Sequence, residues 1–474
     1  MEIDIFLIIN IFLIVGLVFF ERRNPTAALG WVLILLVIPI LGFFLYLVFG
    51  QNFYKKKLSK IKAEDDLELH TIIAEQKAEL ADRRIHLPDK RLESYRGMIS
   101  MLLENNMAYL SQNNLVTVFD DGNALYSDLL AAIGKARHHI HMEYYIIRND
   151  ELGRKVVSAL AAKAREGVEV RLLCDGLGTK LPKKVLQELR SAGGKTAFFF
   201  PSLIPVINLR MNYRNHRKIA VIDGTTGVIG GFNIGDEYLG KGPLGYWRDA
   251  ALKVEGWAVY SMQMRFLMDW NYASGDTLGF SPGYFPEFAG SGSVAMQVVS
   301  SGPDARWNQI KAGYLKLINS AKESVYIQSP YFIPDESVLD ALRIAALSGV
   351  DVRIMIPVKP DHPFVYWSGY SFIGDLLDSG VKAYTYDNGF IHAKTVVVDG
   401  IVASVGSANW DVRSFRLNFE ANAFVYDTQC AGRLKDLFER DLAGCTEITQ
   451  ERYKARPIRV KFKESISRLF SPLL

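Results

Sequence analysis

Apolar residues are concentrated near the N-terminus in two long runs. Ile3–Phe20 is interrupted by only two polar residues, and Trp31–Gly50 forms a second run that contains Pro39. In a helix each run is about long enough to cross a hydrocarbon core of ~30 Å at a rise of ~1.5 Å per residue. The pattern predicts a two-helix transmembrane hairpin over residues 1–50, with a re-entrant or monotopic hairpin as the alternative.

A signal peptide is the competing interpretation of the first run. Glu2 and Asp4 stand where such a peptide carries positive charge, and no small-residue cleavage site follows. A lysine cluster over residues 55–62 favours a cytoplasmic large domain, although Arg22 and Arg23 between the runs oppose this orientation. The same lysines suit anionic lipid headgroups.

From about residue 115 onward, strand and helix patterns alternate, which is typical of an α/β fold. One stretch predicts a strand over 139–145, a helix ending at Arg165 and a strand over 168–173; another predicts a strand over 324–331, a helix ending at Leu347 and a strand over 350–355. The offset between the two stretches drifts only slightly, as expected of an internal duplication. The sequence therefore predicts two pseudo-symmetric lobes, each a mixed sheet flanked by helices.

These patterns divide the chain into five segments. They are a transmembrane hairpin (1–50), a charged helical connector (51–110), a first lobe (111–288), a second lobe (289–450) and a basic amphipathic tail (451–474).

One polar motif, His-x-Lys-x4-Asp-x6-Gly-x-x-Asn, occurs once in each lobe. The first copy is His216, Lys218, Asp223, Gly230 and Asn233, and the second is His392, Lys394, Asp399, Gly406 and Asn409. The chain has only eight histidines, and two of them head these copies. A duplicated constellation on two similar frameworks predicts one site built from both lobes.

Each copy predicts a strand, a turn and a second strand. Lys218–Asp223 and Lys394–Asp399 are the first strands, and Gly224 and Gly400 turn the chain. Because side chains alternate along a strand, the histidine and lysine of each copy point to the same side. Both aspartates join the candidate catalytic set, although a turn or ion-pair role is favoured for them.

Two imidazoles, two ammonium groups and two carboxamides form a cationic site that suits a phosphodiester. One histidine can attack phosphorus and the other can protonate the leaving alkoxide, which gives a phosphohistidine that a second alcohol resolves. This chemistry needs no nucleotide, metal or other cofactor, and the chain has neither a Gly-x4-Gly-Lys-Ser/Thr loop nor a His-Glu-x-x-His motif.

Composition narrows the function further. A net charge of +4 is too small to indicate a nucleic-acid partner, and no interleaved basic–aromatic stripe supports a nuclease. The cysteines Cys174, Cys430 and Cys445 are far apart, with no zinc-binding spacing and no activating context, so inert thiols in a reducing compartment are expected.

The two motifs resemble those of the phospholipase D superfamily, and nearly the whole chain resembles bacterial cardiolipin synthases. The closer resemblance rests on Glu21–Pro25, Leu45–Gly50, Asn212–Lys218, Tyr246–Asp249 and the basic tail. It implies transfer of a phosphatidyl group from one phosphatidylglycerol to another, with release of glycerol. A phospholipase D-type hydrolase is the alternative. The oligomeric state stays open.

The resemblance also implies roles for single residues. Glu420 and Asp249 match the acidic residue that orients a histidine, His216 matches the nucleophile and His392 the general acid. Ser407 matches a serine of the common pattern, whereas the first copy has Gly231 there.

Two further segments suggest membrane contact. Phe198–Ile207 fits either a buried strand with a Pro-bounded loop or an apolar lip that enters the bilayer. The tail from Arg452 interleaves basic and apolar residues, which is typical of a helix lying on anionic lipid, with a solvated basic extension as the alternative.

Overall fold

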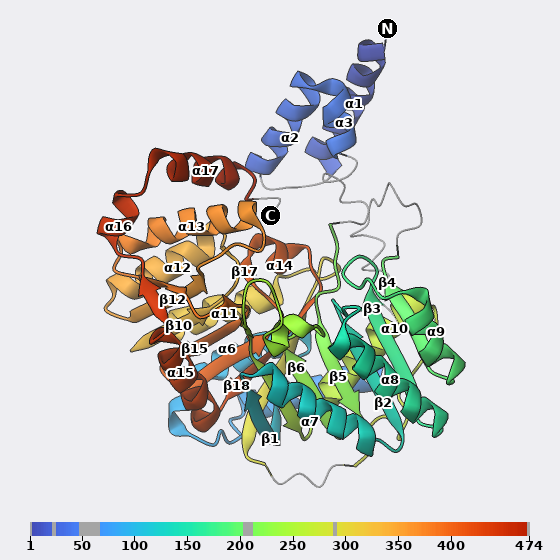
Figure 1. Ribbon diagram of the computed structural model, residues 1–474. Helices are drawn as coiled ribbons and strands as arrows, with labels where there is room; N and C mark the ends of the chain where they lie inside the picture. The colour runs from blue at the N-terminus through green and yellow to red at the C-terminus, as the bar shows by residue number, and fades with distance from the viewer. Residues whose placement is uncertain (1, 21–24, 47–66, 202–211, 288–291, 472–474) are drawn as a thin grey trace. The chain divides into compact units, whose positions relative to one another are not determined.

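The computed structural model describes residues 2–20, 25–46, 67–201, 212–287 and 292–471 (Figure 1). They form two compact units. The N-terminal unit contains the described residues up to 46, together with 212 and 213. The second unit, here called the catalytic unit, contains 67–201 and the described residues from 214 onward.

The described residues of the N-terminal unit include three apolar helices, α1 (Glu2–Phe20), α2 (Pro25–Val37) and α3 (Pro39–Leu45). The second apolar run breaks at Pro39, which has no N–H to donate to the Leu35 carbonyl one turn earlier. The buried Asn10 side chain replaces this donor, with Nδ2 2.9 Å from the carbonyl oxygens of both Leu35 and Pro39. Asn10, a polar residue within the first apolar run, therefore donates to the carbonyl groups at the helix break in the second run.

Among the helices of the described ranges, none combines the length and the apolar character that a bilayer crossing requires. The transmembrane hairpin over residues 1–50 is therefore not confirmed.

The catalytic unit is built on one mixed sheet of fifteen strands. The first arm of the sheet contains β1 (Ser111–Phe119), β2 (His139–Tyr144), β3 (Glu169–Asp175), β4 (Lys195–Phe199), β5 (Lys218–Ile222), β6 (Thr226–Gly230) and β8 (Ala251–Glu255). The second arm contains β9 (Val294–Ser301), β10 (Ser324–Gln328), β12 (Asp351–Pro357), β13 (Lys382–Tyr386), β15 (Thr395–Val398), β16 (Val402–Gly406), β18 (Glu420–Tyr426) and β19 (Cys445–Glu447).

The strand order is mirrored about the antiparallel pair β1 and β9. Outward from this pair the first arm runs β8-β6-β5-β2-β3-β4, and the second runs β18-β16-β15-β10-β12-β13 before β19. In both arms β2–β3–β4 and the equivalent β10–β12–β13 pair in parallel, whereas the inner strands, such as β5/β6 and β15/β16, pair antiparallel. The edge strand β19 adds an antiparallel pair to the second arm. The predicted α/β class with a mixed sheet and flanking helices is confirmed.

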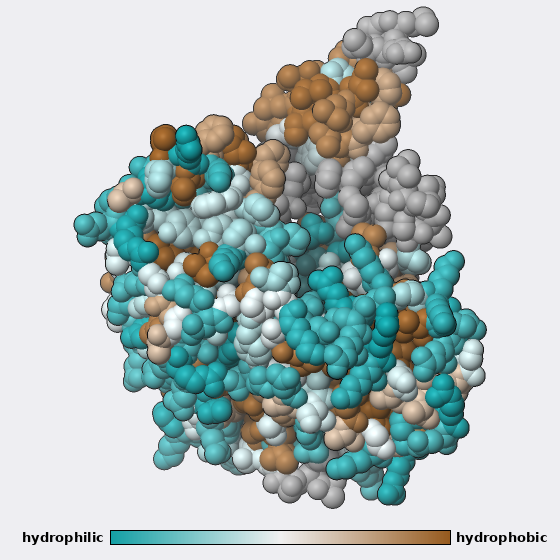
Figure 2. All heavy atoms as spheres, viewed as in Figure 1, coloured by the Kyte–Doolittle hydropathy of each residue, from teal (hydrophilic) through white to brown (hydrophobic). Residues whose placement is uncertain are grey.

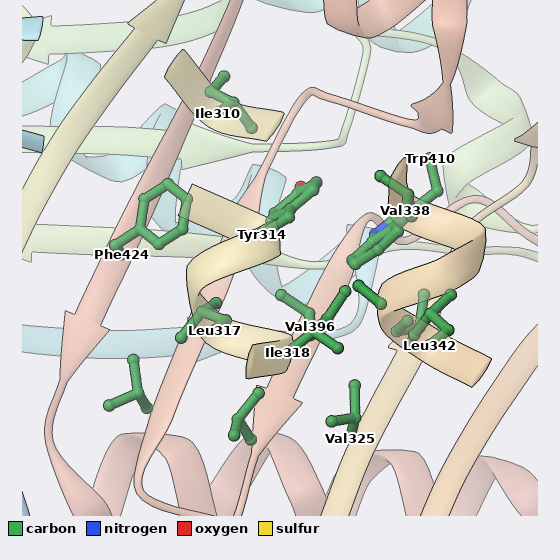
Figure 3. Packing of buried hydrophobic residues seen from close by; sticks show 14 of the residues in the cluster. Ile310, Tyr314, Leu317, Ile318, Val325, Val338, Leu342, Val396, Trp410 and Phe424 are labelled. Atoms are coloured by element: carbon green, nitrogen blue, oxygen red, sulfur yellow. The ribbon is translucent and has the colours of Figure 1, made fainter. Parts of the chain in front are cut away.

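Helices cover both arms. They include α7 (Gly122–Lys135), α8 (Glu151–Arg165) and α9 (Lys183–Ser191) on the first arm, and α11 (Gln309–Ser320), α12 (Glu336–Leu347) and α13 (Pro363–Leu377) on the second. Figure 3 shows α11 and α12 placing Tyr314, Leu317 and Leu342 over the strands, and Tyr314 stacks on Trp410 with ring centroids 4.3 Å apart.

Besides one hydrophobic core in each arm, the catalytic unit has a third core that both arms share. It contains side chains from both arms and from α10 (Ala258–Ser274) and α15 (Thr428–Leu442). Side chains along β5 alternate between two cores. Ala220 and Ile222 pack in the core under α7 and α8. Ile219 and Val221 point the other way and pack in the shared core. The two arms are thus held together by buried apolar surface, which fixes the ends of their strands relative to each other.

The predicted connector contributes to a core. Residues 67–106 form α5 (Leu67–Ala81), the 3₁₀ helix η2 (Lys90–Tyr95) and α6 (Arg96–Asn106). The buried side chains of η2 and α6 include Leu92, Met98 and Leu102, and they pack in the core of the second arm. Residues 67–106 are therefore part of the catalytic unit.

Candidate functional site

The segments that carry the two histidines cross between the arms. Asn215, just before His216, forms a bridge with Phe419 of the second arm, and the His216 N–H donates to the Phe419 carbonyl at 2.8 Å. In the mirror arrangement, β14 (Phe390–Ile391) pairs with β7 (Trp247–Arg248), and the His392 N–H donates to the Arg248 carbonyl at 2.7 Å. Backbone pairing therefore sets each histidine beside the acidic residue of the opposite arm.

His216 lies beside Glu420. Its Nδ1 is 2.9 Å from Glu420 Oε2 and 3.0 Å from the Ser407 carbonyl oxygen. Because both neighbours are acceptors, Nδ1 carries the hydrogen and Nε2 keeps the lone pair. Burial lowers the pKa of His216 to about 4, against the opposing attraction of Glu420. His216 is therefore a neutral base with a fixed tautomer.

His392 lies beside Asp249, with Nδ1 2.5 Å from Asp249 Oδ2. Burial and then the charge of Lys394 hold the pKa of His392 well below its usual range. Burial raises the pKa of Asp249 to about 6, although Lys394 opposes this shift. Burial also raises the pKa of Glu420, but the neighbouring His216 and Lys218 reverse the shift, so its net direction is downward. The two carboxylates therefore differ in how readily they take a proton.

The two motif lysines are buried against the histidines. Lys218 Nζ donates to the His216 carbonyl at 2.5 Å, and Lys394 Nζ lies 2.8 Å from His392 Nδ1. Burial lowers the pKa of Lys394 to about 8, and it holds the pKa of Lys218 well below the usual range. An anion entering the site would favour the charged form of both ammonium groups and raise their pKa.

Ser407 and Gly231 explain why the two copies differ. The Ser407 hydroxyl donates to Glu420 Oε2 at 2.5 Å and accepts from the Ala421 N–H. At Gly231 a Cβ atom would lie only 2.1 Å from Asp249 Oδ1. The first copy therefore has glycine because the Asp249 carboxylate occupies the space that a serine side chain would need.

A cavity of about 960 Å³ joins the two halves of the site. His216, His392, Asn233 and Asn409 all line it. Asn233 Nδ2 donates to the Tyr238 hydroxyl at 3.1 Å. Asn409 Oδ1 is buried and has no hydrogen-bond partner among the described residues, which leaves it available to a donor in the cavity.

Several cavity residues were not predicted as site residues. They include the cationic Arg214 and Arg413, the aromatic Tyr145, Trp247 and Tyr331, and the acidic Asp236, Glu237, Asp361 and Asp411. Closeness to the two motifs in the sequence could have identified Arg214 and Arg413, which lie two residues before His216 and four after Asn409. The acidic residues lie in a 3₁₀ helix (Asp236 and Glu237), a loop (Asp361) and a short strand (Asp411), at positions that no repeated pattern marks.

Asp223 and Asp399 are not brought into the cavity. Each has a left-handed backbone, with φ of 53° and 54°, and is followed by a left-handed glycine, an Asp-Gly pair that is favoured in tight hairpins. Their carboxylates accept backbone N–H groups, from Arg137, His138 and His139 for Asp223 and from Lys322, Glu323 and Ser324 for Asp399. Both aspartates therefore lie in turns, the position that fits the turn role favoured for them from the sequence.

The apolar lip predicted over Phe198–Ile207 lies largely outside the described residues. Of its members, Phe199 and Phe200 are buried and their rings pack around Phe419, next to Glu420.

Two protein families match the chain. The family described as "Cardiolipin synthase, PLD-like domain" matches residues 129–270 and 314–442, more than half of the chain. A second, described as "Phospholipase_D-nuclease N-terminal", matches residues 8–51.

Close relatives extend over nearly the full length. The chain is 51% identical to the major cardiolipin synthase of Bacillus subtilis, over 99% of this chain and 98% of that protein. It is 50% identical to cardiolipin synthases of Staphylococcus aureus, over 98% of this chain and 95% of that one, and of Listeria monocytogenes, over 99% and 98%.

Among solved structures, phosphatidylserine synthase of Haemophilus influenzae superposes with a TM-score of 0.62 at 15% identity, covering 81% of this chain and 100% of that one. At this identity the likeness concerns the fold alone. The sequence matches carry the assignment: the chain belongs to the cardiolipin synthases of the phospholipase D superfamily.

Proposed function

We propose that this chain transfers a phosphatidyl group from one phosphatidylglycerol to the headgroup of a second, through a phosphohistidine on His216. The observation that supports this most strongly is the pairing across the arms. His216 and His392 face one cavity, and each is held at Nδ1 by a carboxylate from the opposite arm. Two oriented imidazoles on one cavity are what a double displacement at phosphorus requires.

In the first step, the Nε2 lone pair of His216 attacks the phosphorus of the donor lipid. The bond between phosphorus and the glycerol oxygen breaks as the N–P bond forms. Lys218 and Lys394 stabilise the charge on the non-bridging oxygens, and Glu420 stabilises the positive imidazolium ring that results. Arg214 and Arg413 add positive charge to the cavity wall.

His392 supplies the proton to the departing glycerol oxygen. In the empty cavity its pKa is far too low for this task, because burial and cationic neighbours disfavour the imidazolium. The bound phosphodiester brings a negative charge that offsets the two lysines and raises the pKa of His392. The acid is therefore charged only when substrate is present.

In the second step, His392 takes the proton from a hydroxyl of the second phosphatidylglycerol, and the resulting oxygen attacks phosphorus. The N–P bond to His216 breaks, cardiolipin leaves, and both histidines return to their starting states. Asp236, Glu237 and Asp361 on the cavity wall provide acceptors for glycerol hydroxyls. These carboxylates suit a polyol headgroup in both the donor and the acceptor position.

The proposal includes attachment to the membrane. The helices of the N-terminal unit leave large apolar side chains exposed, among them Phe12, Phe19, Leu29 and Val37. Such a surface is stable in contact with lipid, so we propose that this unit anchors the enzyme as a multi-pass hairpin. The lysines over residues 55–62 favour a cytoplasmic position for the catalytic unit.

The test incubates full-length protein with phosphatidylglycerol vesicles in EDTA, without nucleotide, and identifies the products. Cardiolipin and glycerol are expected, with loss of both in His216→Ala. The matched control is His138→Ala, which removes an exposed imidazole outside the cavity and should leave the rate unchanged. Phosphatidic acid as the sole lipid product would instead indicate a hydrolase, and a requirement for metal or nucleotide would contradict the mechanism.

A further inference from the structure

The last helix of the chain presents its apolar residues outward. Helix α17 (Ile458–Leu469) packs on α13. The residues that α17 buries are polar, namely Glu464 and Ser467. Glu464 Oε1 is 2.7 Å from Arg456 Nε, and Arg468 Nη2 is 2.5 Å from Asp375 Oδ2 of α13. Polar contacts therefore fix the orientation of the helix.

The opposite face of α17 is apolar and open. Ile458, Phe462 and Leu469 are 77%, 67% and 75% exposed. Spacings of four and seven residues place them on one side of the helix. A helix on the surface of a water-soluble domain normally has the reverse arrangement, so this face needs a partner that is itself apolar.

This apolar face continues to the rim of the cavity. The ring of Phe470, the residue that follows α17, is 6.3 Å from the ring of Phe364 on α13. Phe364 is 57% exposed, and its neighbours His362 and Val365 line the cavity. We call the residues Ile458, Phe462, Leu469, Phe470 and Phe364 the ridge. Figure 2 shows brown apolar surface over this end of the catalytic unit, among teal residues.

The charges beside the ridge identify the partner. Arg459, Lys461 and Lys463 are exposed on α17, and the helix's one acidic residue, Glu464, is buried and paired. An apolar stripe flanked by uncompensated positive charge is complementary to a bilayer of anionic lipid, which offers phosphates beside acyl chains. A second copy of the chain would bring the same positive charges together.

We propose that the ridge docks on the anionic bilayer and places the mouth of the cavity at the level of the lipid headgroups. This deepens the proposed function, since it describes how a two-chain lipid reaches His216 and His392 without leaving the membrane. Anchoring by the N-terminal unit alone would hold the enzyme near the membrane but would not orient its cavity.

The direct test measures lipid contact at the ridge. An environment-sensitive fluorophore is attached through Phe462→Cys, in full-length protein that also carries Cys445→Ala, because Cys174 and Cys430 are buried. The control position is Leu115→Cys, an exposed apolar site on β1. Figure 1 shows β1 at the end of the catalytic unit away from α17. In phosphatidylglycerol vesicles, brominated acyl chains should quench the first label at least roughly fivefold more strongly than the second.

Equal quenching at the two positions would overturn the proposal. So would a label that brominated lipid and aqueous iodide both fail to reach, because that result would indicate a protein partner such as a second copy.

Activity provides the second readout. Joint replacement of Ile458, Phe462 and Leu469 by serine should lower turnover of vesicular phosphatidylglycerol by at least roughly tenfold and leave turnover of monomeric short-chain phosphatidylglycerol unchanged. Leu347→Ser on α12 removes an equally exposed apolar side chain, at 73%, and should change neither rate. Equal loss on both substrates would contradict docking, whereas no turnover of the short-chain lipid by the parent protein would contradict the proposed function itself.

Discussion

At the residue scale, the two halves of the site place a carboxylate beside the histidine with different side chains. Glu420 is long enough to reach His216 while Ser407 fills the space beside it and donates to the same carboxylate oxygen. Asp249 is shorter, and it reaches His392 because Gly231 leaves that space empty. Serine with glutamate and glycine with aspartate are therefore matched pairs, and exchanging one member should damage its own half of the site.

The substitution Gly231→Ala tests this matching. The new methyl group would overlap the Asp249 carboxylate, which must then move away from His392, and we expect kcat to fall by at least about tenfold. Gly134→Ala on α7 is the control, because a Cβ there meets nothing within 4 Å and alanine favours a helix by up to ~1 kcal/mol. Unchanged kcat in the Gly231→Ala protein, measured on short-chain phosphatidylglycerol, would rule out steric matching.

The pH dependence of kcat/KM should report the groups around His392. Since the pKa of Asp249 is raised to about 6, activity should fall below that pH as the carboxylate that orients His392 is protonated. Since the pKa of Lys394 is lowered to about 8, activity should also fall above pH 8 as the ammonium charge is lost. The profile should be bell-shaped, and Asp249→Asn should be slower and lack the acidic limb.

As the pH falls through the acidic limb and activity is lost, the contribution of Asp249 to folding stability should increase. The pKa of Asp249 is higher in the folded than in the unfolded chain, so the folded state binds more protons between about pH 6 and 4. This group therefore favours folding as the pH falls through that window, which separates the loss of activity from unfolding. An acidic limb near pH 6 that persists in Asp249→Asn would show that another group controls it.

At the element scale, the short parallel pair of β7 and β14 carries His392 across to the first arm. The crossing depends on Gly389, whose φ is 123° and whose Cβ, if present, would lie 2.3 Å from the Tyr246 carbonyl oxygen. Backbone contact this close leaves room for no side chain. The equivalent crossing at His216 is a single bridge between Asn215 and Phe419.

Gly389→Ala should separate β14 from β7 and lower kcat by at least about tenfold, because His392 would lose its position beside Asp249. Gly380→Ala is a matched control, since Gly380 also has a positive φ, of 91°, but a Cβ there would meet nothing within 4 Å. In thermal unfolding, the control should lose only the ~1–2 kcal/mol of unfolding free energy that a left-handed alanine costs. Its kcat should be unchanged. Equal activity of the two proteins would mean that the crossing does not position His392.

At the scale of the whole molecule, the site exists only because the arms are joined. The duplicated motif predicted both histidines, both lysines and the turn aspartates, because these features lie within a few residues of one another and repeat. The contacts of Glu420 with His216 and of Asp249 with His392, each from one arm to the other, were not predictable. The repeat is equally consistent with each carboxylate contacting the histidine of its own arm. The acidic cavity wall was missed because Asp236, Glu237, Asp361 and Asp411 follow no spacing that repeats between the two arms.

A phosphatidyl ester whose leaving group is p-nitrophenol, which departs without a proton, separates the roles of the two histidines most directly. With this substrate we expect His392→Ala to release about one equivalent of nitrophenol per enzyme and then stop, because its general base for the second step is missing. Rapid digestion under alkaline conditions should then locate the phosphatidyl group on His216, and His216→Ala should give no burst. A burst in His216→Ala with the adduct on His392 would reverse the roles, and turnover by the parent protein without any adduct would contradict the phosphohistidine.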